Sequence, residues 1–153
     1  MGPDTRRGWD PKKICADCGV EGCSWSSRNS RIVPGAGDTE GPFASFCIFC
    51  YSQRSKRNKQ DVSPLPLGVK PPGVPLEFIE QEITVITQSG SEYNFGLPEQ
   101  ESPREVSCKT RDLGFSKCEI LLLEKGQPIW LRGADVDPKD AYWQTSPVTS
   151  IIY

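Results

Sequence analysis

The sequence contains no histidine among its 153 residues. This absence excludes nucleophiles activated by histidine, general acid–base catalysis by histidine and every metal site that needs an imidazole ligand. Nucleases that use histidine both as a metal ligand and as a base are excluded for the same reason. The sequence also lacks a glycine-rich phosphate-binding loop. We therefore do not expect an enzyme.

No run of apolar residues approaches the ~20 residues that are needed to cross a membrane. The N-terminal segment MGPDTRRGWDPKK has charges but no apolar stretch after them, so it lacks the pattern of a secretory signal. Position 6, where a myristoylation pattern needs Ser or Thr, is Arg6. We expect an intracellular protein, cytoplasmic or associated with the nucleoid, that does not contact a membrane.

Hydrophobic residues are scarce, at 36% of the chain, whereas the 14 Pro and 14 Gly together make up about 18%. This composition favours short elements, many turns and at least one irregular linker over long helices. The length suits one ordinary domain or two small ones.

Cysteine, by contrast, is plentiful and regularly spaced. Four of the seven cysteines form two C-x-x-C pairs, in CADCG and in FCIFC. Two such pairs separated by a loop are typical of a structural zinc site, in which four thiolates complete a tetrahedron and leave no open position. We therefore predict that one zinc ion is bound by Cys15, Cys18, Cys47 and Cys50.

The other three cysteines leave alternatives open. Cys23 either replaces one of the four ligands or is a packed thiol. Cys108 and Cys118 are predicted to be a reduced, packed pair, because they offer too few ligands for a second metal site. Disulfides would be an alternative for all seven in a secreted protein, but the N-terminal segment does not indicate secretion.

The second C-x-x-C pair is predicted to open a short helix that ends near residues 58–60. Its N-terminal amides would face the thiolates, which suits the helix dipole. The small core beside the zinc is predicted to contain Phe43 and Phe46, and Trp25 either belongs to this core or contacts a ligand. Four basic residues follow the second pair with no acidic residue between them: Arg54, Lys56, Arg57 and Lys59.

Residues 15–59 resemble a GATA-type zinc finger of the treble-clef class. The shared features are CADCG, Trp25 shortly after it, FCIFCY at the start of a short helix, and a basic tail. The resemblance implies that the four cysteines bind zinc and that the helix and its tail contact DNA. The loop between the two pairs is longer than the usual ~15–20 residues, and the positions after the Trp where basic residues are familiar hold Ser26, Ser27 and Arg28.

Residues 61–76 contain five prolines and are predicted to be an extended linker between a zinc module at residues 1–60 and a β domain at residues 77–153. In the β domain, apolar residues alternate in EITVIT and EYNF, and again in CEILLLE and QPIWL, which predicts two hairpins. Residues 148–153 are predicted to be a last strand, and residues 97–105 an exposed acidic loop. The predicted class is α+β, with a small antiparallel sheet or barrel.

Residues 87–93 and 145–151 resemble short uncharacterised β proteins of phages and actinobacteria, a resemblance that implies no function.

Charge differs between the two halves. Residues 1–60 hold ten Lys and Arg and six Asp and Glu, whereas residues 61–153 hold eight and fourteen. The first hypothesis is therefore a zinc protein that binds nucleic acid through Arg54, Lys56, Arg57 and Lys59. The second is an adaptor that binds a protein partner, in which zinc only stabilises the fold. A continuous positive face on the predicted helix would favour the first hypothesis, and a covered face the second.

Overall fold

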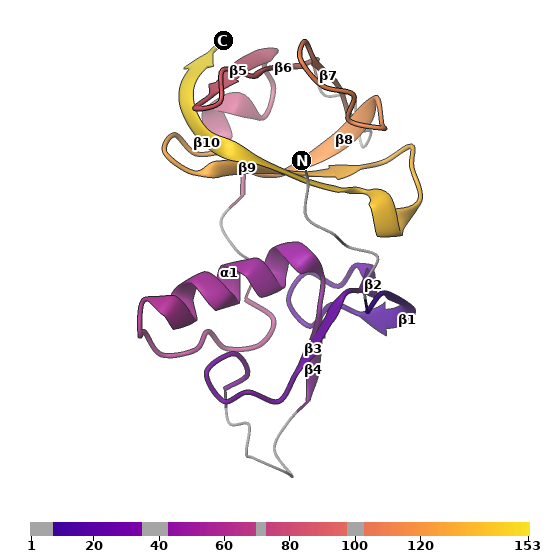
Figure 1. The fold of residues 1–153 in the computed structure, drawn as a ribbon, viewed down its shortest axis with the longest axis vertical. Helices are drawn as coiled ribbons and strands as arrows, with labels where there is room; N and C mark the ends of the chain where they lie inside the picture. Colours follow the sequence, from indigo (N-terminus) through magenta and orange to yellow (C-terminus); the bar gives the residue numbers. More distant parts are fainter. Residues whose placement is uncertain (1–7, 35–42, 70–72, 98–102) are drawn as a thin grey trace. The chain divides into compact units, whose positions relative to one another are not determined.

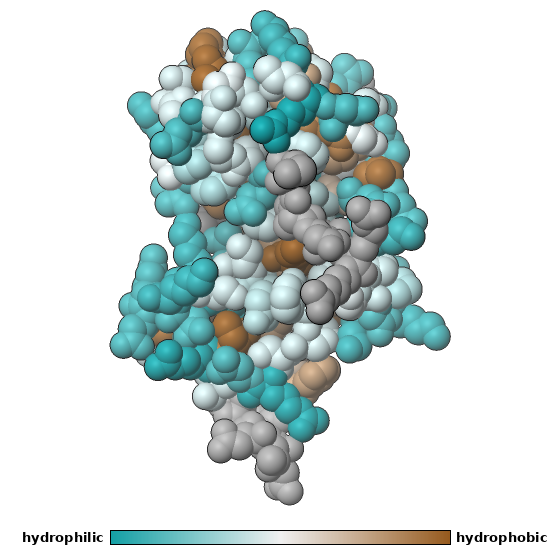
Figure 2. Space-filling view, in the orientation of Figure 1, coloured by the Kyte–Doolittle hydropathy of each residue, from teal (hydrophilic) through white to brown (hydrophobic). Residues whose placement is uncertain are grey.

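The computed structural model describes residues 8–34, 43–69, 73–97 and 103–153. The chain divides into two compact units with a boundary between residues 71 and 72. We call them the N-terminal unit and the C-terminal unit (Figure 1). On the face drawn in Figure 2, hydrophilic residues predominate and hydrophobic residues are scattered, as is usual for a surface.

The described residues of the N-terminal unit form two small antiparallel sheets, β1 with β2 and β3 with β4, followed by one helix (Figure 1). The elements are β1 (Asp10–Ile14), β2 (Glu21–Cys23), β3 (Trp25–Ser27), β4 (Ala44–Phe46) and α1 (Ile48–Lys59). Cys47 is the N-cap of α1, and Gln60 is its C-cap. The predicted helix after the second cysteine pair is confirmed, including its end near residues 58–60.

The core of the N-terminal unit is small. Phe46 and Val33 are fully buried, and Ile32 is 2% exposed. The prediction that Phe43 belongs to this core is wrong, since its side chain is 52% exposed at the edge of the β3–β4 ribbon. Trp25 is also largely exposed, at 45%, and one of its faces stacks on Tyr51 with ring centroids 4.7 Å apart. So few buried side chains give little hydrophobic stabilisation.

The C-terminal unit is a closed antiparallel barrel with the strand order β10-β5-β6-β7-β8-β9. Its strands are β5 (Ile83–Thr87), β6 (Glu92–Phe95), β7 (Arg104–Cys108), β8 (Lys117–Leu122), β9 (Pro128–Gly133) and β10 (Tyr142–Ile152). Two short 3-10 helices, η1 (Leu76–Phe78) and η2 (Pro138–Asp140), accompany them. Closure leaves no unpaired sheet edge in the barrel, which removes the usual site of edge-to-edge aggregation.

Strand β10 closes the barrel by changing partner along its length (Figure 1). Its first half pairs with β9, and its second half pairs with β5. The register is irregular on both sides of Pro147, which has no N–H to give to a ladder. An irregularity at this position lets one long strand bend from one neighbour to the other.

The interior of the barrel follows the period of two that the sequence predicts. Along β5, Ile83, Val85 and Thr87 are buried and alternate with partly exposed residues, and Tyr93 and Phe95 are buried on β6. Leu123, Ile129 and Leu131 are fully buried. Side chains therefore fill the interior, as they do in other small barrels.

Both predicted hairpins are confirmed as β5–β6 and β8–β9. Two boundaries are wrong: β7 begins at Arg104, inside the predicted acidic loop, and β10 begins at Tyr142, well before residue 148. Residues 98–102 of that loop lie outside the described residues.

Cys108 and Cys118 are reduced and pack against the barrel core, as predicted, but they do not form a pair. Cys118 is the ladder partner of Arg104, which lies four residues before Cys108 on β7. Four residues of a strand span about 13 Å, so the two thiols are well separated. Cys118 is fully buried, and this burial raises the pKa of its thiol to about 12.

We expect Leu131→Ala to lower the free energy of unfolding of the barrel by about 2–5 kcal/mol, because it leaves a cavity in a filled interior. Leu97→Ala makes the same chemical change at a side chain that is 57% exposed, and should cost less than about 0.5 kcal/mol. Hydrogen exchange of peptides from β8 and β9 in urea measures the free energy of unfolding of both variants. Equal losses in the two variants would contradict a packed barrel interior.

Candidate metal centre

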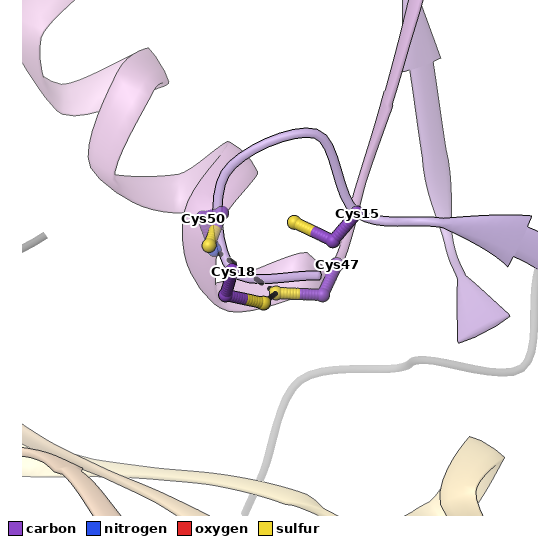
Figure 3. A group of neighbouring side chains, drawn as sticks. All are labelled: Cys15, Cys18, Cys47 and Cys50. Carbon is purple, nitrogen blue, oxygen red and sulfur yellow. Dashed lines mark hydrogen bonds between the residues drawn. The ribbon is translucent and has the colours of Figure 1, made fainter. Parts of the chain in front are cut away.

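Two separate elements of the N-terminal unit bring four thiols together (Figure 3). Cys15 and Cys18 lie in the turn between β1 and β2, and Cys47 and Cys50 lie at the start of α1. The four sulfur atoms are all within 4.8 Å of one another. Three of the four residues are buried, and Cys18 is partly exposed.

Backbone hydrogen bonds form each of the two turns. In the first, the Gly19 N–H donates to the Cys15 carbonyl and the Cys15 N–H donates to the Val20 carbonyl, both at 3.0 Å. Gly19 has a φ of +76°, a conformation that glycine adopts without strain. In the second, the Cys50 N–H donates to Cys47 Sγ at 3.4 Å. An N–H group at the helix N-terminus therefore points at a sulfur atom and favours its thiolate form.

The spacing of the sulfur atoms fits a single tetrahedral cation. A zinc–sulfur distance of ~2.3 Å implies an edge of about 3.8 Å between neighbouring sulfurs. Cys18 Sγ and Cys47 Sγ are 3.8 Å apart, and the remaining sulfurs lie within the same small cluster. The four thiols can therefore bind a metal ion, for which zinc is the typical choice.

The thiols also influence one another electrostatically. Hydrogen bonds from Cys18, Cys47 and Cys50 lower the pKa of Cys15. Hydrogen bonds with Cys15 and Cys18 raise the pKa values of Cys47 and Cys50. Ionisation of the first pair thus opposes ionisation of Cys47 and Cys50, and four thiolates at these distances require a bound cation.

Cys23 lies outside this cluster. It is 1% exposed on β2, and burial raises the pKa of its thiol to about 12. It is therefore a packed thiol, which decides between the two roles that the sequence left open.

A buried ion pair lies directly beside the cysteine cluster. Asp17 stands between the first two cysteines, and Arg54 stands one helical turn after Cys50. Both side chains are 2% exposed. Arg54 Nε donates to Asp17 Oδ2 and Arg54 Nη2 donates to Asp17 Oδ1, each at 2.7 Å. This bidentate geometry is the strong form of an arginine–carboxylate interaction.

The rest of the Arg54 guanidinium is bonded to backbone carbonyls. Nη1 donates to the carbonyls of Ile32 and Leu65, and Nη2 donates to the carbonyl of Pro66. All five N–H donors of the group are therefore used. The Gly68 N–H donates to Asp17 Oδ1 at 3.1 Å, so the carboxylate is bonded from a further segment.

These contacts change the interpretation of the basic residues after Cys50. Arg54 is enclosed and has no donor left for a phosphate, so it does not belong to a nucleic-acid surface. Sequence reasoning placed it at the surface because it stands in a run of charged residues. Lys56 and Lys59 are exposed, and Arg57 is half-buried with its Nε donating to the Ser63 carbonyl.

The same contacts fix the first part of the predicted linker. The carbonyls of Ser63, Leu65 and Pro66 and the N–H of Gly68 are all bonded to Arg57, Arg54 or Asp17. Residues 63–68 therefore belong structurally to the N-terminal unit.

No protein-family model matches this chain, and no similar protein was found among curated proteins or solved structures. Within the described residues, no helix is long and apolar enough to cross a membrane.

We expect Cys50→Ala to lose the bound metal and to unfold the N-terminal unit, because structural zinc contributes about 10–16 kcal/mol of apparent binding free energy. Cys23→Ala is the matched control, since it removes a buried thiol from the same unit but not from the cluster. Metal analysis of protein purified under reducing conditions should give one zinc per chain for the control and none for Cys50→Ala. Zinc retention in Cys50→Ala would contradict the assigned ligands.

We expect Arg54→Gln to lower the free energy of unfolding of the zinc-loaded N-terminal unit by about 3–5 kcal/mol, because it leaves the Asp17 carboxylate buried without its countercharge. Arg31→Gln is the control. Arg31 pairs with Asp61 at 3.7 Å, but the two side chains are 66% and 89% exposed. Its loss should cost about 0–1 kcal/mol. Urea unfolding followed at Trp25 measures the free energy of unfolding of both variants. Similar losses of stability in the two would contradict a structural role for the buried pair of Asp17 and Arg54.

Proposed function

We propose that this protein binds a structural zinc ion and that its N-terminal unit contacts nucleic acid. The zinc ligands are Cys15, Cys18, Cys47 and Cys50. Thiolate ligands select zinc or an iron–sulfur cluster over hard cations. Four protein ligands leave no position for an activated water, so the proposal assigns the metal a structural role and no catalytic one.

The small core of the N-terminal unit supports a structural role for the metal. Units of this size rarely stabilise themselves by hydrophobic burial alone and often depend on a metal or on disulfides. We further propose a treble-clef arrangement, in which the first cysteine pair lies in a β-turn and the second opens the helix. The order β1, turn, β2, β3, β4, α1 supports it.

The observation that carries the nucleic-acid proposal is the charge of the last turn of α1. This turn holds Lys56, Arg57 and Lys59, and the first turn of α1 contains no acidic residue. Lys56 and Lys59 are three residues apart and therefore share a face of the helix. Apart from the buried pair, residues 8–34 and 43–69 hold seven Lys and Arg and three Asp and Glu, an excess of four positive charges.

A second feature of the same unit supports the proposal. The ring of Phe43 is exposed, and two cations lie over it: Lys13 Nζ at 5.4 Å and the Arg28 Cζ at 5.6 Å from the ring centroid. Exposed aromatic rings beside basic side chains are common on surfaces that stack bases and hold the phosphates of single strands.

An adaptor that binds a protein partner is the second candidate. The burial of Arg54 favours it, because it removes one of the four cations expected on the helix. The exposed rings of Trp25 and Phe43 would also suit a protein interface.

Binding of fluorescent duplex DNA, single-stranded DNA and single-stranded RNA at several salt concentrations tests the proposal. We expect Lys56→Gln/Lys59→Gln to weaken binding to all sequences alike. It should also reduce the slope of log K against log salt on duplex DNA by about 0.9 for each lost phosphate contact. Arg57 stays unchanged in this variant because it holds the Ser63 carbonyl.

Lys125→Gln/Lys139→Gln is the control with the same change in charge, made at exposed residues of the C-terminal unit. It should leave the slope unchanged. If every nucleic acid binds the wild-type protein more weakly than ~10⁻⁴ M at low salt, binding falls below ordinary non-specific affinity and the adaptor becomes the better candidate.

A further inference from the structure

A polar pocket lies at one end of the barrel in the C-terminal unit, where the β5–β6 turn and the β7–β8 loop meet β10. Its volume is about 360 Å³. The residues that line it come from these three places and from β6: Ser89, Tyr93, Arg111, Gln144, Thr145 and Ser146. None of them carries a carboxylate, and all of them have a hydrogen-bond donor.

Two sequence segments to which no function could be given meet at this pocket. Residues 87–93 run from the end of β5 through the β5–β6 turn to the start of β6, and residues 145–151 lie in β10. The Gln88 N–H donates to the Pro147 carbonyl at 2.8 Å, and the Ser89 N–H donates to Ser146 Oγ at 3.2 Å. The hydroxyls of Ser89 and Ser146 are 3.1 Å apart. Segments more than fifty residues apart thus form one wall of the pocket.

The hydroxyls of this wall form a chain. Ser89 Oγ lies 3.4 Å from Ser91 Oγ, and Thr110 Oγ1 donates to Ser91 Oγ at 3.1 Å. A hydroxyl hydrogen rotates freely about its C–O bond and can turn toward a ligand. The chain can therefore redirect a donor into the pocket without moving the backbone.

Tyr93 contributes a buried phenol. Its side chain is 2% exposed, and the Trp143 indole N–H donates to its oxygen at 3.4 Å. Burial raises the pKa of this phenol, so it keeps its hydrogen at neutral pH. The oxygen accepts from Trp143 and the phenol keeps one O–H donor, which can be offered to the neighbouring Cys108 or to a ligand.

Arg111 supplies the charge of the pocket. Its side chain is exposed, and its positive charge is close enough to lower the pKa of Tyr93 against the effect of burial. Within the described residues, no carboxylate forms an ion pair with Arg111. The nearby carboxylates are engaged elsewhere: Asp112 accepts the Gly114 N–H, and Glu92 pairs with Lys109 at 2.8 Å.

We propose that this pocket binds the phosphate group of a small phosphate monoester. Arg111 would neutralise the phosphate, and the hydroxyls of Ser89, Ser146 and Tyr93 would donate to its oxygens. A tetrahedral oxyanion accepts hydrogen bonds from several directions, which matches donors that come from four separate places in the barrel. The volume exceeds that of a phosphate ion and leaves room for the group to which the phosphate is esterified. The proposal is independent of zinc and of nucleic-acid binding by the other unit.

Titration of the ¹⁵N-labelled, zinc-loaded full chain by NMR tests the proposal with three probes: inorganic phosphate, ribose 5-phosphate and acetate. We expect saturable shifts of the Ser89 amide and the Trp143 indole N–H with both phosphates. Ribose 5-phosphate should bind more tightly than inorganic phosphate, and acetate should bind at least about tenfold more weakly, because it offers fewer acceptors and less charge.

Arg111→Gln should weaken ribose 5-phosphate binding about tenfold or more, since a hydrogen bond to a charged group is lost. Lys139→Gln removes the same charge from an exposed site outside the pocket and should change the affinity less than about twofold. Ser146→Ala should weaken binding several-fold and leave the spectrum of the other strands unchanged.

Three results would overturn the proposal. The first is the absence of saturable shifts at Ser89 and Trp143 with either phosphate. The second is equal weakening by Arg111→Gln and Lys139→Gln, which would indicate a general charge effect. The third is acetate binding as tight as that of ribose 5-phosphate, which would make the pocket a carboxylate site.

Discussion

The N-terminal unit depends on the buried contact between the Arg54 guanidinium and the Asp17 carboxylate. Burying two charges costs several kcal/mol for each ion, and the cost is recovered only where every remaining donor and acceptor finds a partner. Arg54 meets this condition, because its five N–H groups reach the carboxylate and three carbonyls. The carbonyls belong to Ile32, Leu65 and Pro66, so one side chain joins α1 to segments before and after it.

This ion pair and the cysteine cluster are two parts of one arrangement. Asp17 lies between Cys15 and Cys18. Arg54 follows Cys50 by four residues, so Cys50 and Arg54 lie on the same face of α1. A metal held by the four thiols therefore also aligns the carboxylate with the guanidinium. Because each contact lowers the entropic cost of forming the other, we infer that metal binding and closure of the ion pair are cooperative.

The features that the sequence predicted are those that local patterns determine. The C-x-x-C spacing is enough to place two thiols in one turn, and the alternation along residues 83–95 is enough to predict a hairpin with one buried face. The features that were missed depend on partners far away in the chain. Arg54 looks like a surface cation until Asp17, 37 residues earlier, is placed beside it. Phe43 looks like a core residue, but the edge of the β3–β4 ribbon leaves it exposed.

The buried face of α1 also limits how the N-terminal unit can contact nucleic acid. Ile48, Phe49, Cys50 and Arg54 are buried, so the first two turns of the helix serve the metal and the ion pair. Only the last turn offers cations to solvent, which allows two or three phosphate contacts. With so few phosphate contacts, the binding constant depends only weakly on the salt concentration. Phosphate contacts alone also carry no sequence information. Phe43 would add a ring for stacking, and the neighbouring Lys13 and Arg28 would add charge. Under the proposed function, this surface favours contact with backbone and unpaired bases over reading of the major groove by the helix.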